Sequence, residues 1–293
     1  MPTRRPVPTL AVLIAAALAV HVATAQQLTL PNQKDSVHFA VIGDSGTGGS
    51  DQLHIAQRLT AMRNTFPFEI VLMMGDNLYG NEGPRDFEKK FEVPYKALLD
   101  AKVKFYASLG NHDEANQTKY KPFNMNDKKY YTFKPPNGSV RFFALDSNYM
   151  DQEQIAWLEK ELAASQSDWK IMFFHHPLYS SGSTHGSDTS LRDQLEPLFI
   201  KYGVDAVFAG HEHFYERIKP QKGIYYFVSG GAGKVRRGDI QRTNLTEKGF
   251  DQGYHFMLVE VTPKMLYFQT ISDKGATVDS GALPRRETPA TPK

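Results

Sequence analysis

The sequence predicts an α/β fold in which two packed β-sheets are flanked by helices. Apolar runs rich in β-branched and aromatic residues recur along the chain, as expected for strands that are buried on both faces. Segments with helical spacing separate the earlier runs, and strands follow one another near the C-terminus. At 293 residues the chain is long enough for one large domain with an ample core.

Each predicted element follows from one of these patterns. Continuous apolar character predicts seven strands, at residues 37–42, 70–74, 104–109, 140–145, 170–174, 206–209 and 224–228. One-sided apolar spacing predicts four helices, at about residues 53–62, 87–99, 151–162 and 191–199, the third capped by Asp151. Two further apolar runs, 254–261 and 265–271, flank a Thr-Pro-Lys turn and predict a hairpin.

The N-terminus has the features of a secretory leader. A basic start at Arg4 and Arg5 precedes an apolar stretch, 10–20, that is short for a membrane span, and residues 23–25 read Ala-Thr-Ala, a small-x-small cleavage site. We therefore expect a signal peptide at residues 1–25, a folded domain at 26–280 and a flexible C-terminal tail at 281–293. The protein would then be secreted or periplasmic, without membrane contact after cleavage. A single membrane anchor is the alternative interpretation.

Composition narrows the possible chemistry. The chain has no cysteine, which excludes disulfides and thiolate metal ligands and, in an exported protein, favours a bacterial periplasm. Cleavage after residue 25 would remove two Arg and no acid, so Lys+Arg falls from 34 to 32 against 32 Asp+Glu. The resulting formal charge of zero gives no reason to expect a nucleic-acid partner. We expect a monomer, and the sequons at residues 116, 137 and 244 would matter only in a eukaryotic secretory route.

Five short polar segments, each just after a predicted strand, carry most of the chemistry. They supply carboxylates, imidazoles, an amide and a phenol, which is the donor mixture of a two-metal hydrolytic site. Open α/β sheets place their sites at the carboxyl ends of strands, and a glycine there permits a sharp turn. The segments are Gly43-Asp44-Ser45-Gly46, Gly75-Asp76-Asn77-Leu78-Tyr79, Gly110-Asn111-His112-Asp113, His175-His176-Pro177 and Gly210-His211-Glu212-His213.

Any one of these segments, taken alone, is more often ordinary turn chemistry, because Asp and Asn bond the local backbone readily. The distribution of histidine argues against that interpretation for the set. Three histidines, His38, His54 and His255, fall within strand or helix patterns and are interpreted as packing or surface residues. The other histidines downstream of the leader all fall in predicted loops: His112, His175, His176, His185, His211 and His213.

The segment 43–49 allows three other interpretations. It lacks the Lys of a phosphate-binding P-loop. Its Gly-Asp-Ser-Gly run resembles the nucleophile segment of trypsin-like proteases, but their Ser follows the His and Asp in the chain. A GDSL-type esterase would use Ser45 as nucleophile, yet no Asp-x-x-His occurs after Asp205. That alternative also leaves Asp76, Tyr79 and the pair of histidines at 211 and 213 unexplained.

Taken together, from about Val37 to His213, the five segments resemble the metallophosphoesterase superfamily, and specifically the purple acid phosphatases. Many metallophosphoesterases open with Asp-x-His, whereas here Gly46 stands at the His position and Tyr79 follows the second Asp, as in purple acid phosphatases. The predicted helix with Trp157-Leu158 also resembles the family's segment before the His-x-Pro block. The resemblance implies a four-layer β-sandwich of two mixed sheets flanked by helices, with one catalytic domain at 26–280.

The resemblance also implies a dinuclear metal centre. Two carboxylates and a phenolate balance three of the five positive charges of Fe(III) and a divalent ion, and a bridging hydroxide leaves about one net positive charge for an anionic substrate. A hard phenolate favours Fe(III) at the Tyr79 position, and a neutral amide suits divalent Fe, Zn or Mn at the Asn111 position. The implied ligands are Asp44, Asp76, Tyr79 and His213 for the first metal and Asp76, Asn111, His175 and His211 for the second, with Asp76 bridging.

These roles predict an acid phosphatase that hydrolyses phosphate monoesters by attack of a metal-bound hydroxide. His112 is the expected general acid, Asp113 would orient it, and His185 would bind phosphate or share the acid role. His176 either lines the pocket or has no role. A phosphodiesterase or nucleotidase on the same site is the alternative reaction. A non-catalytic binding protein is the other alternative, although no implied ligand is lost.

The surrounding loops carry two further expectations. Substrate preference should depend on the loops 81–84, 115–129 and 180–188, and the sequence does not specify it. Mammalian purple acid phosphatases carry an exposed regulatory loop before the Trp-containing helix, and here only a few residues separate Asp146 from that helix. The basic residues that follow the last single strand are interpreted as a solvated loop rather than a substrate clamp: Lys234, Arg236, Arg237 and Arg242.

Overall fold

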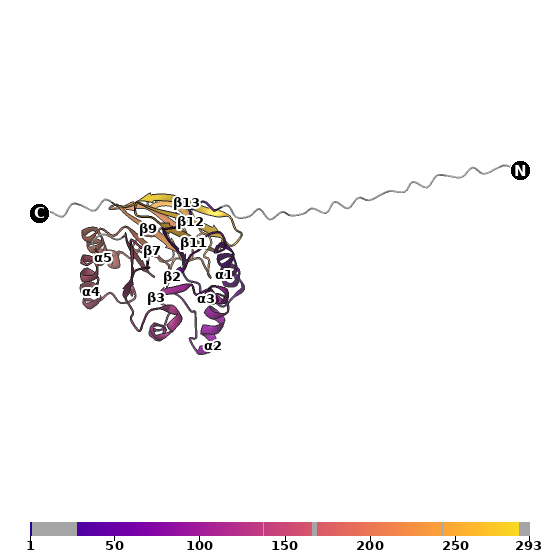
Figure 1. The fold of residues 1–293 in the computed structure, drawn as a ribbon, viewed down its shortest axis with the longest axis horizontal. Helices are drawn as coiled ribbons and strands as arrows, with labels where there is room; N and C mark the ends of the chain where they lie inside the picture. The colour runs from indigo at the N-terminus through magenta and orange to yellow at the C-terminus, as the bar shows by residue number, and fades with distance from the viewer. Residues whose placement is uncertain (2–27, 137, 166–168, 242, 287–293) are drawn as a thin grey trace.

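The computed structural model describes residues 1, 28–136, 138–165, 169–241 and 243–286. Two β-sheets pack face to face, with helices α4 and α5 at one side of the molecule and α1, α2 and α3 at the other (Figure 1). Apart from Met1, the predicted leader lies outside the described residues, as do Arg242 and residues 287–293 of the predicted tail. No helix within the described part of the chain is long and apolar enough to cross a bilayer.

The first sheet is mixed and has the strand order β13-β12-β11-β1-β2-β3. Its first three strands in the sequence are parallel, with Phe39 opposite Ile70 and Ile70 opposite Lys104, and β11, β12 and β13 continue the sheet antiparallel to one another. The bounds are β1 Val37–Ile42, β2 Ile70–Met74, β3 Lys104–Ser108, β11 His255–Val261, β12 Met265–Ser272 and β13 Thr277–Pro284.

The second sheet is also mixed, in the order β10-β8-β9-β7-β6-β5-β4. Its central strands β5, β6, β7 and β9 are parallel, and antiparallel strands complete both edges. The bounds are β4 Tyr131–Phe133, β5 Val140–Ala144, β6 Trp169–Phe174, β7 Ala206–Ala209, β8 Tyr215–Gln221, β9 Ile224–Ser229 and β10 Thr246–Phe250.

Helices cover the outer faces of both sheets. Alternation along β6 shows this directly: Ile171 and Phe173 belong to the core between the sheets, and Met172 and Phe174 pack with α4 and α5. The predicted cap of α4 is confirmed, because the Asp151 carboxylate accepts the Gln154 N–H at 2.8 Å. The helices are α1 Ser50–Met62, α2 Pro84–Phe87, α3 Lys96–Asp100, α4 Gln152–Ala163 and α5 Thr189–Tyr202, with a π-helical turn at Glu88–Glu92 and 3₁₀ turns at Ala115–Lys119 and Lys121–Phe123.

Two predictions of local structure were wrong. The helix expected at 87–99 is divided into α2, the π-helical turn and α3. Pro94 lies between the last two and has no N–H to continue the hydrogen-bond ladder there. The tail expected at 281–293 begins too early, since Gly281 pairs with Phe268 and Pro284 with Met265 in β13. The strands that the sequence did not reveal are β4, β8, β10 and β13, three of them edge strands with polar residues, which lack the apolar signature of a strand buried on both faces.

Candidate dinuclear metal centre

Loops from both sheets meet at the site. Asp44 follows β1, Asp76 follows β2 and Asn111 follows β3 in the first sheet, while His175 follows β6 and His211 follows β7 in the second. Backbone hydrogen bonds join neighbouring loops: the Asp44 N–H donates to the Gly75 carbonyl at 3.1 Å and the Gly210 N–H to the His175 carbonyl at 3.0 Å. The five segments singled out in the sequence therefore converge at one place.

The backbone turns sharply at three of the predicted ligands. Asp44, Asp76 and His211 have φ angles of 55°, 50° and 68°, in the left-handed region that L-residues seldom occupy. Gly110 is required for a different reason, because a Cβ at this position would lie 2.2 Å from Asp76 Oδ1. Such turns direct consecutive polar side chains into the same cleft, and conformational strain of this kind is concentrated at functional sites.

The first group of donor atoms comprises Asp44, Tyr79 and His213. The Tyr79 hydroxyl lies 3.3 Å from Asp44 Oδ1 and 3.3 Å from His213 Nε2, and that nitrogen lies 3.4 Å from the same Asp44 oxygen. Donor atoms of Asp44, Asp76 and His213 all lie within 4.8 Å of one another, which connects this group to the second one through Asp76.

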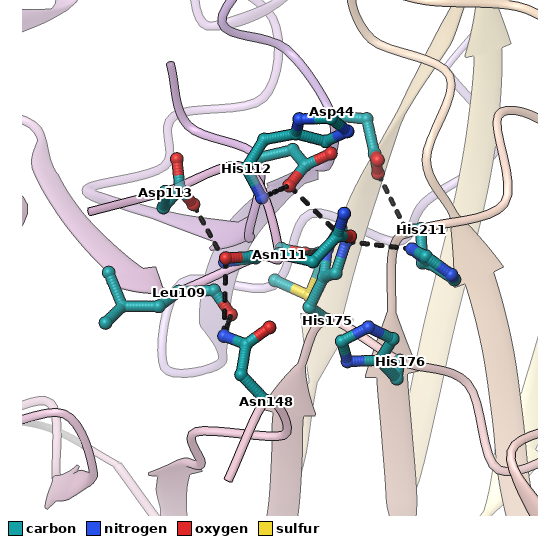
Figure 2. A network of polar contacts seen from close by, with 12 residues as sticks. Asp44, Leu109, Asn111, His112, Asp113, Asn148, His175, His176 and His211 are labelled. Atoms are coloured by element: carbon teal, nitrogen blue, oxygen red, sulfur yellow. Dashed lines mark hydrogen bonds and ion pairs between the residues drawn. The ribbon is translucent and has the colours of Figure 1, made fainter. Parts of the chain in front are cut away.

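The second group surrounds the Nε2 atom of His175. It lies 2.9 Å from Asn111 Oδ1, 3.1 Å from His211 Nδ1 and 3.5 Å from Asp76 Oδ1, and Figure 2 shows Asn111, His175 and His211 directed toward one another. The other ring nitrogen, Nδ1, lies 2.9 Å from the Met74 carbonyl, which can only accept a hydrogen bond. That hydrogen bond places the His175 proton on Nδ1 and leaves the Nε2 lone pair for a metal.

Electrostatics support a cation at these positions. Burial and the charge of Asp76 raise the pKa of Asp44, and the nearby Lys234 ammonium only partly opposes this rise, so the carboxylate is suited to a further positive charge. Burial also lowers the pKa of His211 to about 2 and of His213 to about 4, which keeps both imidazoles neutral and able to coordinate. Burial, Asp44 and Asp76 raise the pKa of Tyr79, so a phenolate here requires a strongly charged ion. The donor set therefore fits two metal ions.

Asp113 has a different position from the one predicted. Its Oδ2 accepts the Asn77 and Gly110 N–H groups and the Asn77 amide, and its Oδ1 accepts the Leu78 N–H and the Gln117 amide. Burial raises the pKa of this carboxyl, but all five partners donate, and such an environment binds the ionised form. Asp113 thus ties the loop after β2 to the loop after β3, and these contacts leave neither oxygen for the His112 ring.

His112 is exposed and lies beside the first donor group. Its ring centroid is 5.0 Å from that of Tyr79, and its N–H donates to Asp76 Oδ1 at 3.1 Å, a bond drawn in Figure 2. The backbone of His112 is thus fixed by a predicted ligand while its imidazole can meet a substrate. The His112 ring is thus accessible to solvent next to the first donor group.

His185 and His176 lie beside the second donor group. The His185 ring is 4.2 Å from that of His211, and the His176 ring is 4.5 Å from that of His211, measured between centroids. These three histidines line a cavity of about 300 Å³ together with Asp188. Of the two interpretations of His176, lining the pocket or having no role, the structure supports the first. Its Nδ1 lies 2.9 Å from Ser147 Oγ, which holds the ring in place.

The predicted basic loop is only partly solvated. Arg237 is exposed, as expected, but Arg236 lies 3.6 Å from Glu212 Oε2, 3.4 Å from Asp239 Oδ2 and 3.5 Å from His185 Nε2. Lys234 lies over the Tyr79 ring, with Nζ 3.4 Å from the centroid. The interpretation of Lys234 and Arg236 as solvated was therefore wrong, because default exposure of charge does not anticipate a loop that folds back onto the site.

Lys90 is a residue that the sequence did not reveal. Its side chain is buried, and its Nζ donates to the carbonyls of Tyr79 and Asn81, each at 2.7 Å, while pairing with Asp86. It holds the loop that presents Tyr79. Nothing in the Lys89-Lys90 pair signals which of the two is buried.

The position of Ser45 argues against the esterase alternative. Ser45 is 2% exposed, which leaves little access for a substrate.

Comparison with known proteins identifies the family. The family model described as calcineurin-like phosphoesterase matches residues 37–215. This chain belongs to that family. Human tartrate-resistant acid phosphatase type 5 is 26% identical to this phosphoesterase, with 90% of this chain and 97% of that protein covered. Purple acid phosphatase 7 of Arabidopsis thaliana is 27% identical, with 86% and 87% covered. The predicted resemblance is confirmed.

Solved structures confirm the fold. The purple acid phosphatase PPD1 of yellow lupin has a TM-score of 0.73 at 20% identity, with 87% of this phosphoesterase and 55% of that chain covered. GAP50 of Plasmodium has a TM-score of 0.71 at 17% identity, with 86% and 90% covered. The latter is described as an anchor in the inner membrane complex, so function must be argued from the site and not from the fold.

Proposed function

We propose that this phosphoesterase is a secreted or periplasmic, monomeric acid phosphatase that hydrolyses phosphate monoesters at a dinuclear metal centre. The observation that carries the proposal is the convergence of seven donors, in two connected groups, on one cleft. Their chemistry is that of two hard cations, since they comprise carboxylates, imidazoles, an amide and a phenol: Asp44, Asp76, Tyr79, Asn111, His175, His211 and His213.

The donor sets differ, and this suggests different metals. Asp44, Tyr79 and His213 include a phenol whose ionisation requires a high charge, which favours Fe(III) there. Asn111, His175 and His211 add no negative charge of their own and suit divalent Fe, Zn or Mn. Asp76 Oδ1 lies 3.5 Å from His175 Nε2 and would bridge the two positions. When bound, the ions would polarise the phosphoryl oxygens and activate a water for in-line attack.

The remaining steps fall to the residues at the rim. His112 would hold a proton and donate it to the leaving oxygen, because its ring is exposed beside Tyr79. His185 would contact the phosphate from the second donor group, next to His211, and its Nε2 lies 3.5 Å from the Arg236 guanidinium. Asp113 would act only by positioning, through the loops that carry Tyr79 and Asn111.

Metal removal and reconstitution test this proposal. Full-length protein is treated with chelator, assayed with p-nitrophenyl phosphate at pH 5, and reloaded with iron and zinc. A metallophosphatase loses activity and regains it, and a binding protein shows no turnover with metal present. An esterase using Ser45 would leave p-nitrophenyl phosphate intact and would hydrolyse p-nitrophenyl acetate before and after chelation. N-terminal sequencing of exported protein should begin at Gln26, and sedimentation should give a monomer. Retention of residues 1–25 in a membrane fraction would favour the anchor alternative.

A further inference from the structure

Glu212 lies between two predicted metal ligands, His211 and His213, and the proposed reaction gives its side chain no role. The residue is fully buried. Its backbone belongs to the tight turn that carries both ligands, because the Glu212 N–H donates to the Gly210 carbonyl at 2.8 Å and the Phe214 N–H donates to the Glu212 carbonyl at 2.7 Å. A buried acid requires polar partners, and those of this side chain come from other loops.

The first partner is the loop 182–186, which carries His185. Glu212 Oε1 accepts the Gly186 N–H at 2.6 Å. A Cβ on Gly182 would collide with the same oxygen, so this loop passes directly over the Glu212 carboxyl group. Glu212 therefore contacts the loop on both sides of His185.

A second acid holds the middle of the same loop. Asp239 Oδ1 accepts the hydroxyl groups of Ser183 and Thr184, each at 2.6 Å. The Asp239 carbonyl also accepts the Ser183 N–H at 2.9 Å. Four of the five residues of the loop 182–186 are thus in contact with one of these two acids.

Arg236 connects the two acids to the metal-ligand segment. Its guanidinium lies 3.6 Å from Glu212 Oε2 and 3.4 Å from Asp239 Oδ2. Its backbone N–H donates to the His213 carbonyl at 3.0 Å. The loop with His185 is therefore attached to the segment 211–213 directly through Glu212 and indirectly through Asp239 and Arg236.

The position of the His185 ring depends on this attachment. The ring lies 4.2 Å from the His211 ring between centroids, but His185 is exposed, so packing of its own side chain does not fix it. We infer that Glu212 is a positioning residue that holds His185 at a fixed distance from the metal centre. This inference rests on the proposed function, in which His185 contacts the phosphate.

A double-mutant cycle tests whether Glu212 acts through His185. Metal-loaded wild type, Glu212→Ala, His185→Ala and the double variant are assayed with p-nitrophenyl phosphate. Glu212→Ala should raise KM about 10-fold with little change in kcat, because a displaced His185 binds phosphate poorly. In the His185→Ala background the same substitution should change KM less than about 2-fold, because no ring remains to be positioned. Glu212→Gln should recover most of the loss, since an amide oxygen can accept the Gly186 N–H and Oε2 accepts no hydrogen bond among the described residues.

A second variant disturbs the same contact without changing the metal-ligand segment. Gly182→Ala would push the loop away from Glu212 and should raise KM to a similar extent at wild-type metal content. Amide hydrogen exchange in residues 182–186 should become faster in both Gly182→Ala and Glu212→Ala. Asp205→Asn is the matched control. Asp205 is also a buried acid that accepts a backbone N–H, that of Lys170 at 2.8 Å, but it precedes β7 whereas the metal-ligand segment follows this strand. Asp205→Asn should leave both KM and exchange of 182–186 near wild type.

The outcomes separate this inference from the proposed function. An equal rise in KM with and without the His185 ring would overturn the inference. Loss of metal from Glu212→Ala, together with wild-type KM in Gly182→Ala, would assign Glu212 to the support of His211 and His213 and would also overturn it. If metal-loaded wild type fails to hydrolyse p-nitrophenyl phosphate, the proposed function fails. Exchange of residues 182–186 then still decides whether Glu212 holds the loop, and wild-type exchange in Glu212→Ala would refute that.

Discussion

Replacing Asp113 with Asn should destabilise the protein although the side chain keeps its shape. Oδ1 accepts two hydrogen bonds and Oδ2 accepts three. An amide has one acceptor oxygen, so in either orientation its NH₂ group faces at least two donors. Two bonds to a partly buried carboxylate, at about 1.5 kcal/mol each, give a loss of about 3 kcal/mol. For a domain of this size that corresponds to a fall in Tm of about 6–12 °C.

Calorimetry of the metal-free protein, followed by metal titration, measures both consequences. The loops that Asp113 joins carry Tyr79 and Asn111, so metal affinity should also fall by about 10- to 100-fold, as for other residues that orient ligands. Asp100→Asn is the control, because it breaks only an exposed contact with Lys96, and its Tm should stay near that of wild type. An Asp113→Asn protein with wild-type Tm and wild-type metal affinity would refute the positioning role.

Three further predictions concern the metal centre and pH. Aerobically purified protein should be violet from phenolate-to-Fe(III) charge transfer, and Tyr79→Phe should bleach it; a colourless, zinc-only wild type would defeat the iron assignment. His112→Ala should slow substrates with poor alkoxide leaving groups far more than p-nitrophenyl phosphate, and the wild-type rate should peak below pH 7, because the general acid must be protonated; equal losses would move that role to His185. His255 is fully buried, which lowers its pKa to about 3, so below about pH 6.5 the unfolded chain binds a proton that the folded state does not. The contribution of His255 to the free energy of unfolding is complete above that pH and is smaller by about 2 kcal/mol at pH 5. The free energy of unfolding of His255→Leu, measured by denaturation, should therefore fall less steeply with acid than that of wild type. Parallel pH profiles of the two proteins would contradict the assignment.

The sequence predicted the parts of this protein that repeat a strong local pattern. Buried strands such as β1, β2 and β7 were predicted with their observed bounds, because strands covered on both faces are continuously apolar. The predicted ligands lie together for a related reason, since each polar segment that carries them begins where such a strand ends. Three of the four edge strands, β4, β10 and β13, were missed because they lack a long apolar run, whereas the edge strand β3 has one and was predicted.

What the sequence did not reveal depends on contacts between distant segments. Asp113 lies next to His112 in the chain, and that adjacency suggested a pair, but a carboxylate is bound by whatever donors surround it in space. The Lys90 side chain donates to the backbone carbonyl of Tyr79, from 11 residues further along the chain (90 − 79). The Lys234 side chain lies over the Tyr79 ring, from 155 residues further along (234 − 79). No periodicity in the sequence encodes such a contact.

The left-handed backbone at Asp44, Asp76 and His211 has a consequence for directed evolution. Left-handed conformations cost an L-residue about 1–2 kcal/mol each, and glycine escapes that penalty. Two of the three are also buried carboxylates. A library selected for heat resistance in the presence of chelator would therefore enrich glycine at these positions and discard the catalytic centre. Selection in metal-containing medium would reverse that preference, because bound ions offset the local penalty only when the donors are intact.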